Sequence, residues 1–127
     1  MKHHTAQWVR KAEEDYNAAT SLAAQAKPPR DAACFHCQQA AEKHLKALLQ
    51  ELGLAVPKTH DLTDLLDLLL PHDATLAPLR RGLKSLKRYA VEYRYPGPRA
   101  RTREMQSALR TAARVRAALR ARLGLPD

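Results

Sequence analysis

The stretch CFHCQQAAEKHLKALL, residues 34–49, decides the fold of this chain. Its apolar residues recur at steps of three and four, which is the period of an amphipathic helix. Followed outward, the pattern predicts a helix over residues 30–52, with Pro28 and Pro29 before it and Gly53 as its C-terminal cap. One face is expected to be apolar, with Cys34, Cys37, Ala41, Leu45, Leu48 and Leu52, and the opposite face polar, with His36, Gln39, Lys43, Lys46 and Gln50.

The rest of the chain predicts further helices and no strand. Long helices are expected over residues 5–26, 75–93 and 99–123, and Gly82 inside the second of these indicates close packing or a bend. A short apolar helix follows Thr59, its expected N-cap, and runs to Leu70. Residues 1–127 are therefore predicted to form one all-α domain, an up-and-down bundle of four main helices plus one short helix.

Positive charge is concentrated in the second half of the sequence. The net charge is +9, but residues 80–127 hold 14 Lys and Arg against 3 acids, whereas residues 1–79 hold 8 against 10. A basic half indicates an anionic partner such as nucleic acid, a nucleotide or an acidic protein face. The codon bias of a GC-rich genome is the alternative reason for so many arginines.

Several classes of protein are not expected. No signal peptide is apparent, and no apolar run approaches the roughly 18 residues of a membrane span, so a cytoplasmic protein is predicted. Cys34 and Cys37, with His36 and His44 nearby, invite a zinc or redox interpretation, but a structural zinc site needs four ligands and both cysteines lie on the apolar face. No metal, cofactor or catalytic motif is therefore predicted.

Two clusters in the basic half are candidate binding residues. The first interleaves tyrosines and basic residues, an arrangement that can stack on bases and pair with phosphates. Its alternative is that the tyrosines are buried in the bundle. The second cluster is an arginine face on the last helix, apt for phosphate or carboxylate, with a merely solvated face as its alternative. The first cluster contains Arg88, Tyr89, Tyr93, Arg94 and Tyr95, and the second Arg99, Arg103, Arg110 and Arg114.

Four segments of the sequence stand out in combination: Trp8 with Ala12, Asp15 and Ala19, residues 34–49, KTHDL at 58–62 and RYP at 94–96. Together they resemble the prokaryotic HEPN domain, of the kind paired with minimal nucleotidyltransferases. The resemblance spans almost the whole chain and implies a helical bundle, a homodimer and a nucleotidyltransferase partner, in some cases as a toxin-antitoxin pair.

Many HEPN proteins are metal-independent ribonucleases with an arginine followed, after four to six residues, by a histidine. The corresponding segment here begins at Arg88 and has Tyr93 in place of the histidine, and no histidine follows His72. A phenol with a pKa of about 10 transfers protons poorly at neutral pH. Arg30 and His36 have the right spacing but lie on a different predicted helix.

The sequence therefore favours a noncatalytic module that binds nucleotide or RNA. In the toxin-antitoxin branch, the resemblance also implies nucleotide attachment to a tyrosine such as Tyr93 or Tyr95. One alternative is a divergent ribonuclease toxin that uses Arg88 with Tyr93, His36 or His60. The other is a dimeric scaffold that docks its arginine face on the acids of the nucleotidyltransferase.

Overall fold

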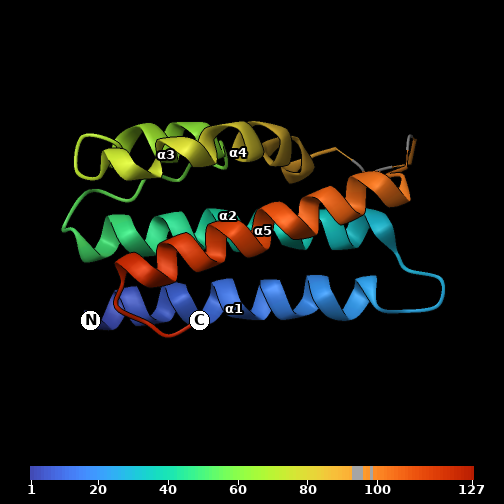
Figure 1. Ribbon diagram of the computed structural model, residues 1–127, viewed down its shortest axis with the longest axis horizontal. Helices are drawn as coiled ribbons and strands as arrows, with labels where there is room; N and C mark the ends of the chain where they lie inside the picture. Colours follow the sequence, from blue (N-terminus) through green and yellow to red (C-terminus); the bar gives the residue numbers. More distant parts are fainter. Residues whose placement is uncertain (93–95, 98) are drawn as a thin grey trace.

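A helix that packs against most of the other elements forms the centre of the molecule. The computed structural model describes every residue except 93–95 and 98, and it confirms the helix predicted around residues 34–49 as α2, Arg30–Glu51. This helix packs most extensively on α1, and also on α5, α3, α4 and η2. Figure 1 shows α1 on one side of α2 and the α3–α4 layer on the other, with α5 crossing it.

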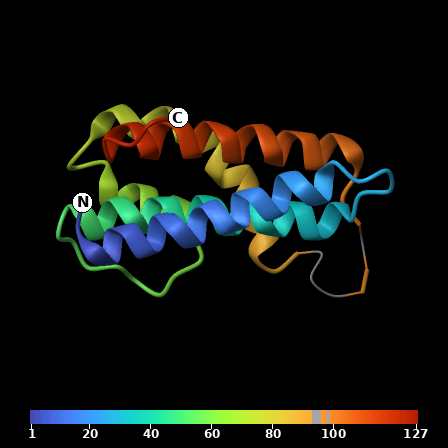
Figure 2. The ribbon, with the colours of Figure 1, turned by 90° about the horizontal axis from the view of Figure 1, so that it is seen from below.

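The described residues form an all-helical bundle without strands, which confirms the predicted fold class. Figure 2 shows α1 and α2 side by side and α5 running along the opposite side of the molecule. No described helix is both long enough and apolar enough to cross a membrane. The elements around α2 are α1 His3–Ala23, α3 Leu62–Leu69, η1 Ala74–Leu79, α4 Arg80–Leu86, η2 Lys87–Ala90 and α5 Thr102–Arg122.

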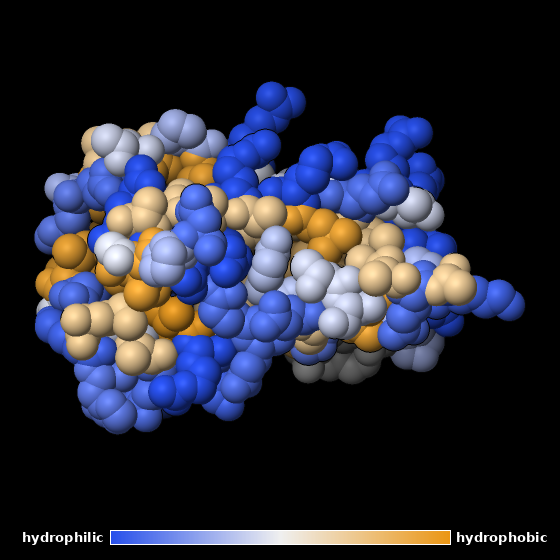
Figure 3. All heavy atoms as spheres, turned by 60° about the horizontal axis from the view of Figure 1, so that its bottom comes forward, coloured by the Kyte–Doolittle hydropathy of each residue, from blue (hydrophilic) through white to orange (hydrophobic). Residues whose placement is uncertain are grey.

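Leucines supply most of the core, from α2, α3, η1, α4 and α5. Each fully buried leucine contributes roughly 2 kcal/mol relative to its exposed state. In the view of Figure 3, apolar side chains at the surface form patches separated by hydrophilic ones. Gly82 has the close contact that its position predicts, since a Cβ there would lie 2.9 Å from Thr111 Cγ2 of α5.

The predicted faces of α2 need two corrections. Lys46 was expected on a polar face but is buried, because α1 covers it: its Nζ lies 3.0 Å from Glu42 Oε2 and 5.6 Å from the centre of the Trp8 ring. Leu52 was expected to face inward but is 43% exposed, since it follows the last turn as the C-cap. Gly53 has the positive φ, 74°, that its predicted capping role requires.

Helix boundaries also differ from the predictions: α1, expected over residues 5–26, is His3–Ala23, and three further differences follow. The helix expected over residues 75–93 is divided into η1, α4 and η2. The break between η1 and α4 has a local cause, because Pro78 lies inside η1 and has no N–H to continue an α-helical ladder. Thr59 is not the N-cap of α3. That role belongs to Asp61, whose side chain accepts hydrogen bonds from the backbone N–H groups of Thr63 and Asp64.

The last helix begins at Thr102 and not at residue 99. The backbone groups of Ala100 form hydrogen bonds with α2: its N–H donates to Asp31 Oδ1 and its carbonyl accepts from Arg30 Nε. These bonds attach the segment before α5 to the start of α2. Arg99 therefore does not share a helix with Arg103, Arg110 and Arg114.

Candidate functional site

A groove of about 330 Å³ lies between the α4–η2 segment and the first half of α5. It brings together residues from the two clusters that the sequence keeps apart. The α4–η2 side contributes Ser85 and Arg88, and the α5 side contributes Arg103, Ser107, Arg110 and Thr111. On α5 these residues are spaced by three and four, so they share one face of the helix. We call this set the basic groove.

Arg88 is held at the wall of the basic groove. Its Nη2 donates to Tyr89 Oη and to Glu104 Oε2, both at 2.8 Å, and its guanidinium lies 4.9 Å from the centre of the Tyr89 ring. Its Nε is 4.0 Å from a carboxylate oxygen of Glu92. The guanidinium is therefore oriented before any ligand arrives.

Tyr89 lines the groove but is only 3% exposed. Burial raises the pKa of its phenol, although the hydrogen bond from Arg88 opposes that effect. The phenol therefore stays protonated at neutral pH. Its ring has no open face for stacking on a base in this structure, so its contribution to the groove is the hydroxyl group.

The remaining residues of the two predicted clusters lie in different places. Tyr93, Arg94 and Tyr95 are outside the described residues. Arg114 is exposed on α5, beyond the residues that line the groove. Arg99 lines a separate cavity at the start of α2, where its Nη1 is 3.7 Å from Asp31 Oδ2.

Other arginines of the basic half form ion pairs within the fold. Glu13 of α1 accepts hydrogen bonds from Arg116 and Arg120. Arg122 donates to Asp73, and Arg80 pairs with Asp67. By contrast, Arg103, Arg110 and Arg114 form no ion pair with another described residue. The uncompensated charge of α5 therefore gathers in and beside the groove.

The histidines considered as alternative catalytic groups lie elsewhere. His36 is 2.9 Å from Asp15 of α1, and His60 is 3.0 Å from Glu42 of α2. His44 is fully buried on α2, and burial lowers its pKa. Among the described residues that line the groove there is no imidazole. The described lining residues therefore present guanidinium and hydroxyl donors, and none of them carries an imidazole, the group whose ordinary pKa lies near neutrality.

Both cysteines are core residues. Cys34 and Cys37 are fully buried, and burial raises the thiol pKa to about 11 and about 12, respectively. Neither is a reactive thiolate at neutral pH. No group of three or more metal-binding side chains occurs among the described residues.

Sequence reasoning missed the hydroxyls and the acid of the groove. Ser107 and Thr111 follow Arg103 at steps of four, and Glu104 stands beside them. The interpretation of α5 considered only its arginines, although the same periodicity places the hydroxyls on their face. Glu104 was detectable as an acid in the first helical turn, where acids are favoured.

Comparisons with known proteins agree with the helical-bundle fold of this chain. The HEPN domain model matches residues 5–122. The crystal structure of TT1696 from Thermus thermophilus is similar, with 28% identity, a TM-score of 0.81 and coverage of 94% of this chain and 98% of that one. The archaeal HEPN homologue ST0689 has 24% identity and a TM-score of 0.77, over 96% and 98% of the two chains, and shows the same fold. No curated protein matches significantly.

Proposed function

Because the chain belongs to the HEPN domain family, we propose that it is a noncatalytic HEPN module that binds the phosphate groups of a nucleotide or of RNA. The observation that carries the proposal is the convergence of Arg88, Arg103 and Arg110 in a groove that no described imidazole lines. Guanidinium groups donate to phosphate oxygens through a planar fork, which gives both affinity and orientation.

The other groups of the basic groove fit the same role. The hydroxyls of Ser85, Ser107 and Thr111 can each donate a hydrogen bond to a phosphate oxygen. Glu104 holds Arg88 while the groove is empty and competes with an arriving anion for it. A phosphate therefore competes with a carboxylate for Nη2 of Arg88, which favours ligands that also reach Arg103 and Arg110.

The proposal also concerns Tyr93 and Tyr95, the oligomeric state of the protein and its protein partner. Tyr93, Arg94 and Tyr95 lie in sequence between the two sides of the groove and belong to the proposed nucleotide-binding residues, and Tyr93 or Tyr95 would be the acceptor if a nucleotide is attached. We propose a homodimer that pairs with a minimal nucleotidyltransferase, in a toxin-antitoxin type of pair. The support for these elements is membership of the family, together with the four sequence segments that resemble its nucleotidyltransferase-associated branch.

The binding claim is tested by calorimetric titration of the purified chain with nucleotides and a short single-stranded RNA at low salt. Removal of one charged hydrogen-bond partner typically costs about 1.5 to 3 kcal/mol, so Arg88→Ala should weaken binding by about tenfold or more. Arg10→Ala, an exposed arginine on α1, is the matched control. No binding to either ligand would overturn the proposal.

The divergent ribonuclease remains the competing function, because the sequence resemblance aligns Arg88 with the arginine of the HEPN ribonuclease motif. It predicts RNA cleavage that persists in EDTA and stops in Arg88→Ala. We expect RNA to remain intact under conditions in which it is bound.

Light scattering tests the proposed homodimer, and co-purification with a co-expressed nucleotidyltransferase tests the proposed partnership.

A further inference from the structure

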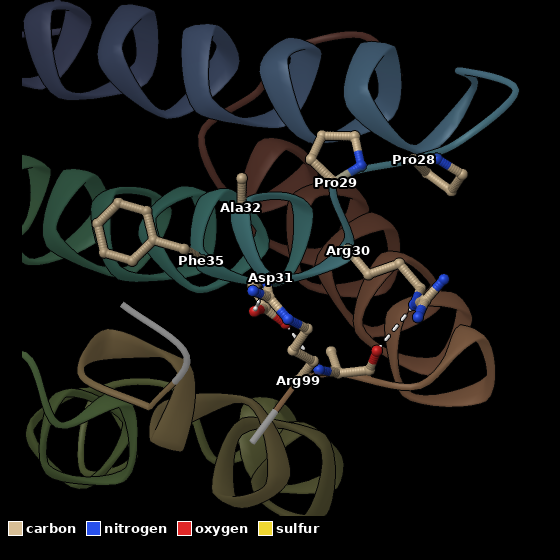
Figure 4. Close-up of a pocket in the computed structure, with 8 residues that line it drawn as sticks. Pro28, Pro29, Arg30, Asp31, Ala32, Phe35 and Arg99 are labelled. Atoms are coloured by element: carbon tan, nitrogen blue, oxygen red, sulfur yellow. Dashed lines mark hydrogen bonds and ion pairs between the residues drawn. The ribbon is translucent and has the colours of Figure 1, made fainter. Parts of the chain in front are cut away.

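A second cavity, of about 530 Å³, lies at the start of α2. Figure 4 shows Pro28 and Pro29 beside Arg30, and Arg99 reaching toward Asp31. None of the residues that line this cavity lines the basic groove. We call it the α2 pocket. The lining residues that matter below are Pro28, Pro29, Arg30, Asp31, Ala32 and Arg99.

The α2 pocket has a fixed framework. The N–H of Ala100 donates to Asp31 Oδ1 at 2.6 Å, and its carbonyl accepts from Arg30 Nε at 2.7 Å. Ala100 itself is buried. The segment that carries Arg99 is thus attached to α2 through both backbone groups of one residue, so the pocket is formed before any ligand arrives.

The main donor of the α2 pocket is Arg30. Its Nε is used for Ala100, and its two terminal nitrogens make no hydrogen bond to another described residue. The terminal nitrogens of a guanidinium form a planar fork that matches the two oxygens of one carboxylate. Arg30 therefore offers a bidentate site for a carboxylate group, held in place by its own bond to the backbone.

The charges around the pocket select among anions. The guanidinium groups of Arg30 and Arg99 and the carboxylate of Asp31 add to one net positive charge. Asp31 Oδ2 is 3.7 Å from Arg99 Nη1, too long for a hydrogen bond, and its carboxylate repels further negative charge on a ligand. A carboxylate with one charge balances this set, whereas a phosphate monoester carries about −1.5 to −2 at pH 7.

The apolar part of the wall favours a ligand that is more than its charged group. The rings of Pro28 and Pro29 and the methyl group of Ala32 present apolar surface next to the fork of Arg30. The volume lies within the range of small-molecule sites, about 300 to 1,000 Å³, which leaves room for an apolar body beside a carboxylate.

We propose that the α2 pocket binds a monocarboxylate with an apolar body. Its carboxylate lies on Arg30, with Arg99 as a second, more exposed cation, and its body lies against Pro28, Pro29 and Ala32. This ligand goes beyond the phosphate groups proposed for the basic groove and uses none of its residues. The same chemistry occurs in free organic acids and at the C-terminus of a polypeptide.

A heteronuclear NMR titration of the nitrogen-labelled full chain tests this assignment with phenylacetate, acetate, phenylacetamide and phenyl phosphate. Shifts should appear at the backbone amides of Asp31, Ala32 and Ala100. Phenylacetate should bind at least about fivefold more tightly than each of the others. The reason differs for each: acetate lacks the ring, the amide lacks the charge, and phenyl phosphate carries more charge than the pocket balances.

Two further ligands distinguish the sources of the carboxylate. N-acetylphenylalanine presents the ring and the carboxylate as they occur at the end of a polypeptide, and its C-terminal amide removes the charge. Binding of the acid that exceeds that of phenylacetate supports the site with a chain terminus as ligand. Weaker binding of the acid supports the site with a free organic acid as ligand. An amide that binds as tightly as its acid contradicts the site.

Asp31→Asn tests the charge match without removing the framework. Its amide oxygen can still accept from the N–H of Ala100, but the net charge of the pocket rises by one. Phenyl phosphate should therefore gain at least about fivefold in affinity relative to phenylacetate. Arg30→Lys keeps the charge and removes the fork, so it should weaken phenylacetate binding by about fivefold or more. Circular dichroism checks that both variants are folded, and Asp31→Asn decides if Arg30→Lys is not.

Three results would overturn the assignment. One is the absence of phenylacetate binding at about 10 mM, and another is phenyl phosphate binding to the wild type as tightly as phenylacetate. The third is an unchanged preference between these two ligands in Asp31→Asn. Arg103→Ala, in the basic groove, is the matched control and should weaken RNA binding while phenylacetate binding stays the same. A failure of the α2 pocket would therefore leave the basic groove with its support.

Discussion

The two halves of α5 carry the same residue type in different surroundings. In the second half, Arg116 and Arg120 both donate to Glu13 of α1. In the first half, Arg103 and Arg110 line a groove and form no ion pair with another described residue. Both sets are part of one continuous helix, so neither residue type nor helical periodicity distinguishes them.

The difference comes from the neighbouring element. The second half of α5 faces α1, which provides an acid. The first half faces α4 and η2, which themselves carry exposed basic residues, Arg81, Lys84 and Arg88. The two segments pack closely where Gly82 meets Thr111, and Arg88 lines the same groove as Arg103 and Arg110. Arg116, Arg120 and Arg122 are therefore paired within the fold, whereas Arg103 and Arg110 are the arginines that we propose for an external anion.

The largest expected effect comes from removing the ion pairs in the second half of α5. Glu13→Ala leaves two partly buried guanidinium groups without their carboxylate and should lower the free energy of unfolding by about 2 to 3 kcal/mol. Urea denaturation measures this change. Glu14→Ala, at an exposed neighbouring position, should change stability by less than about 0.5 kcal/mol. Equal losses in the two variants would show that the pairing contributes nothing.

A smaller effect follows from pH in the same region. Burial lowers the pKa of His44, so the unfolded chain binds this proton more readily than the folded chain. Burial also acts to raise the pKa of Glu13, but hydrogen bonds and charges from Arg116 and Arg120 outweigh it and lower the pKa. Both shifts reduce stability as pH falls, beginning near pH 6.5 for His44 and near pH 4.5 for Glu13.

His44→Leu isolates the histidine part of this pH dependence. Within the described part of the chain, neither ring nitrogen of His44 has a hydrogen-bond partner, and Nε2 lies 3.6 Å from Glu13 Oε1. An apolar replacement should therefore cost less than about 1 kcal/mol at pH 7.5. The variant should lose the decline in stability that starts near pH 6.5 and keep the decline at lower pH. Thermal unfolding across pH 4 to 8 measures both parts. An unchanged pH profile would contradict the role assigned to His44.

These contrasts explain how far the sequence could predict the molecule. Helical periodicity predicted α2 and most of the other helices, because local repeats determine which side chains can be buried together. It did not predict that Lys46 is covered by Trp8 or that Arg116 and Arg120 share Glu13, since those contacts join positions far apart in the chain. The basic groove could not be predicted from the sequence either, because it depends on the distance between α4 and α5.

The smallest expected effect concerns the first half of α5. Glu104→Gln removes the negative charge that holds Arg88, while its amide oxygen can still accept from the N–H of Arg101. RNA affinity should rise by about two- to fivefold, which corresponds to less than about 1 kcal/mol. Fluorescence anisotropy with a labelled oligonucleotide measures it. A lower affinity would mean that Glu104 positions Arg88 for binding and does not compete with the ligand.

The salt dependence of RNA binding tests most directly the claim that the two halves of α5 have different roles. The logarithm of affinity falls with the logarithm of salt concentration by about 0.7 for each phosphate of a single strand that the protein neutralises. The double variant Arg103→Ala with Arg110→Ala should therefore flatten the slope by about 1.4. Arg122→Ala, which removes an arginine paired with Asp73, should keep the wild-type slope. Equal slopes in the wild type and both variants, or a flattening confined to Arg122→Ala, would contradict the account.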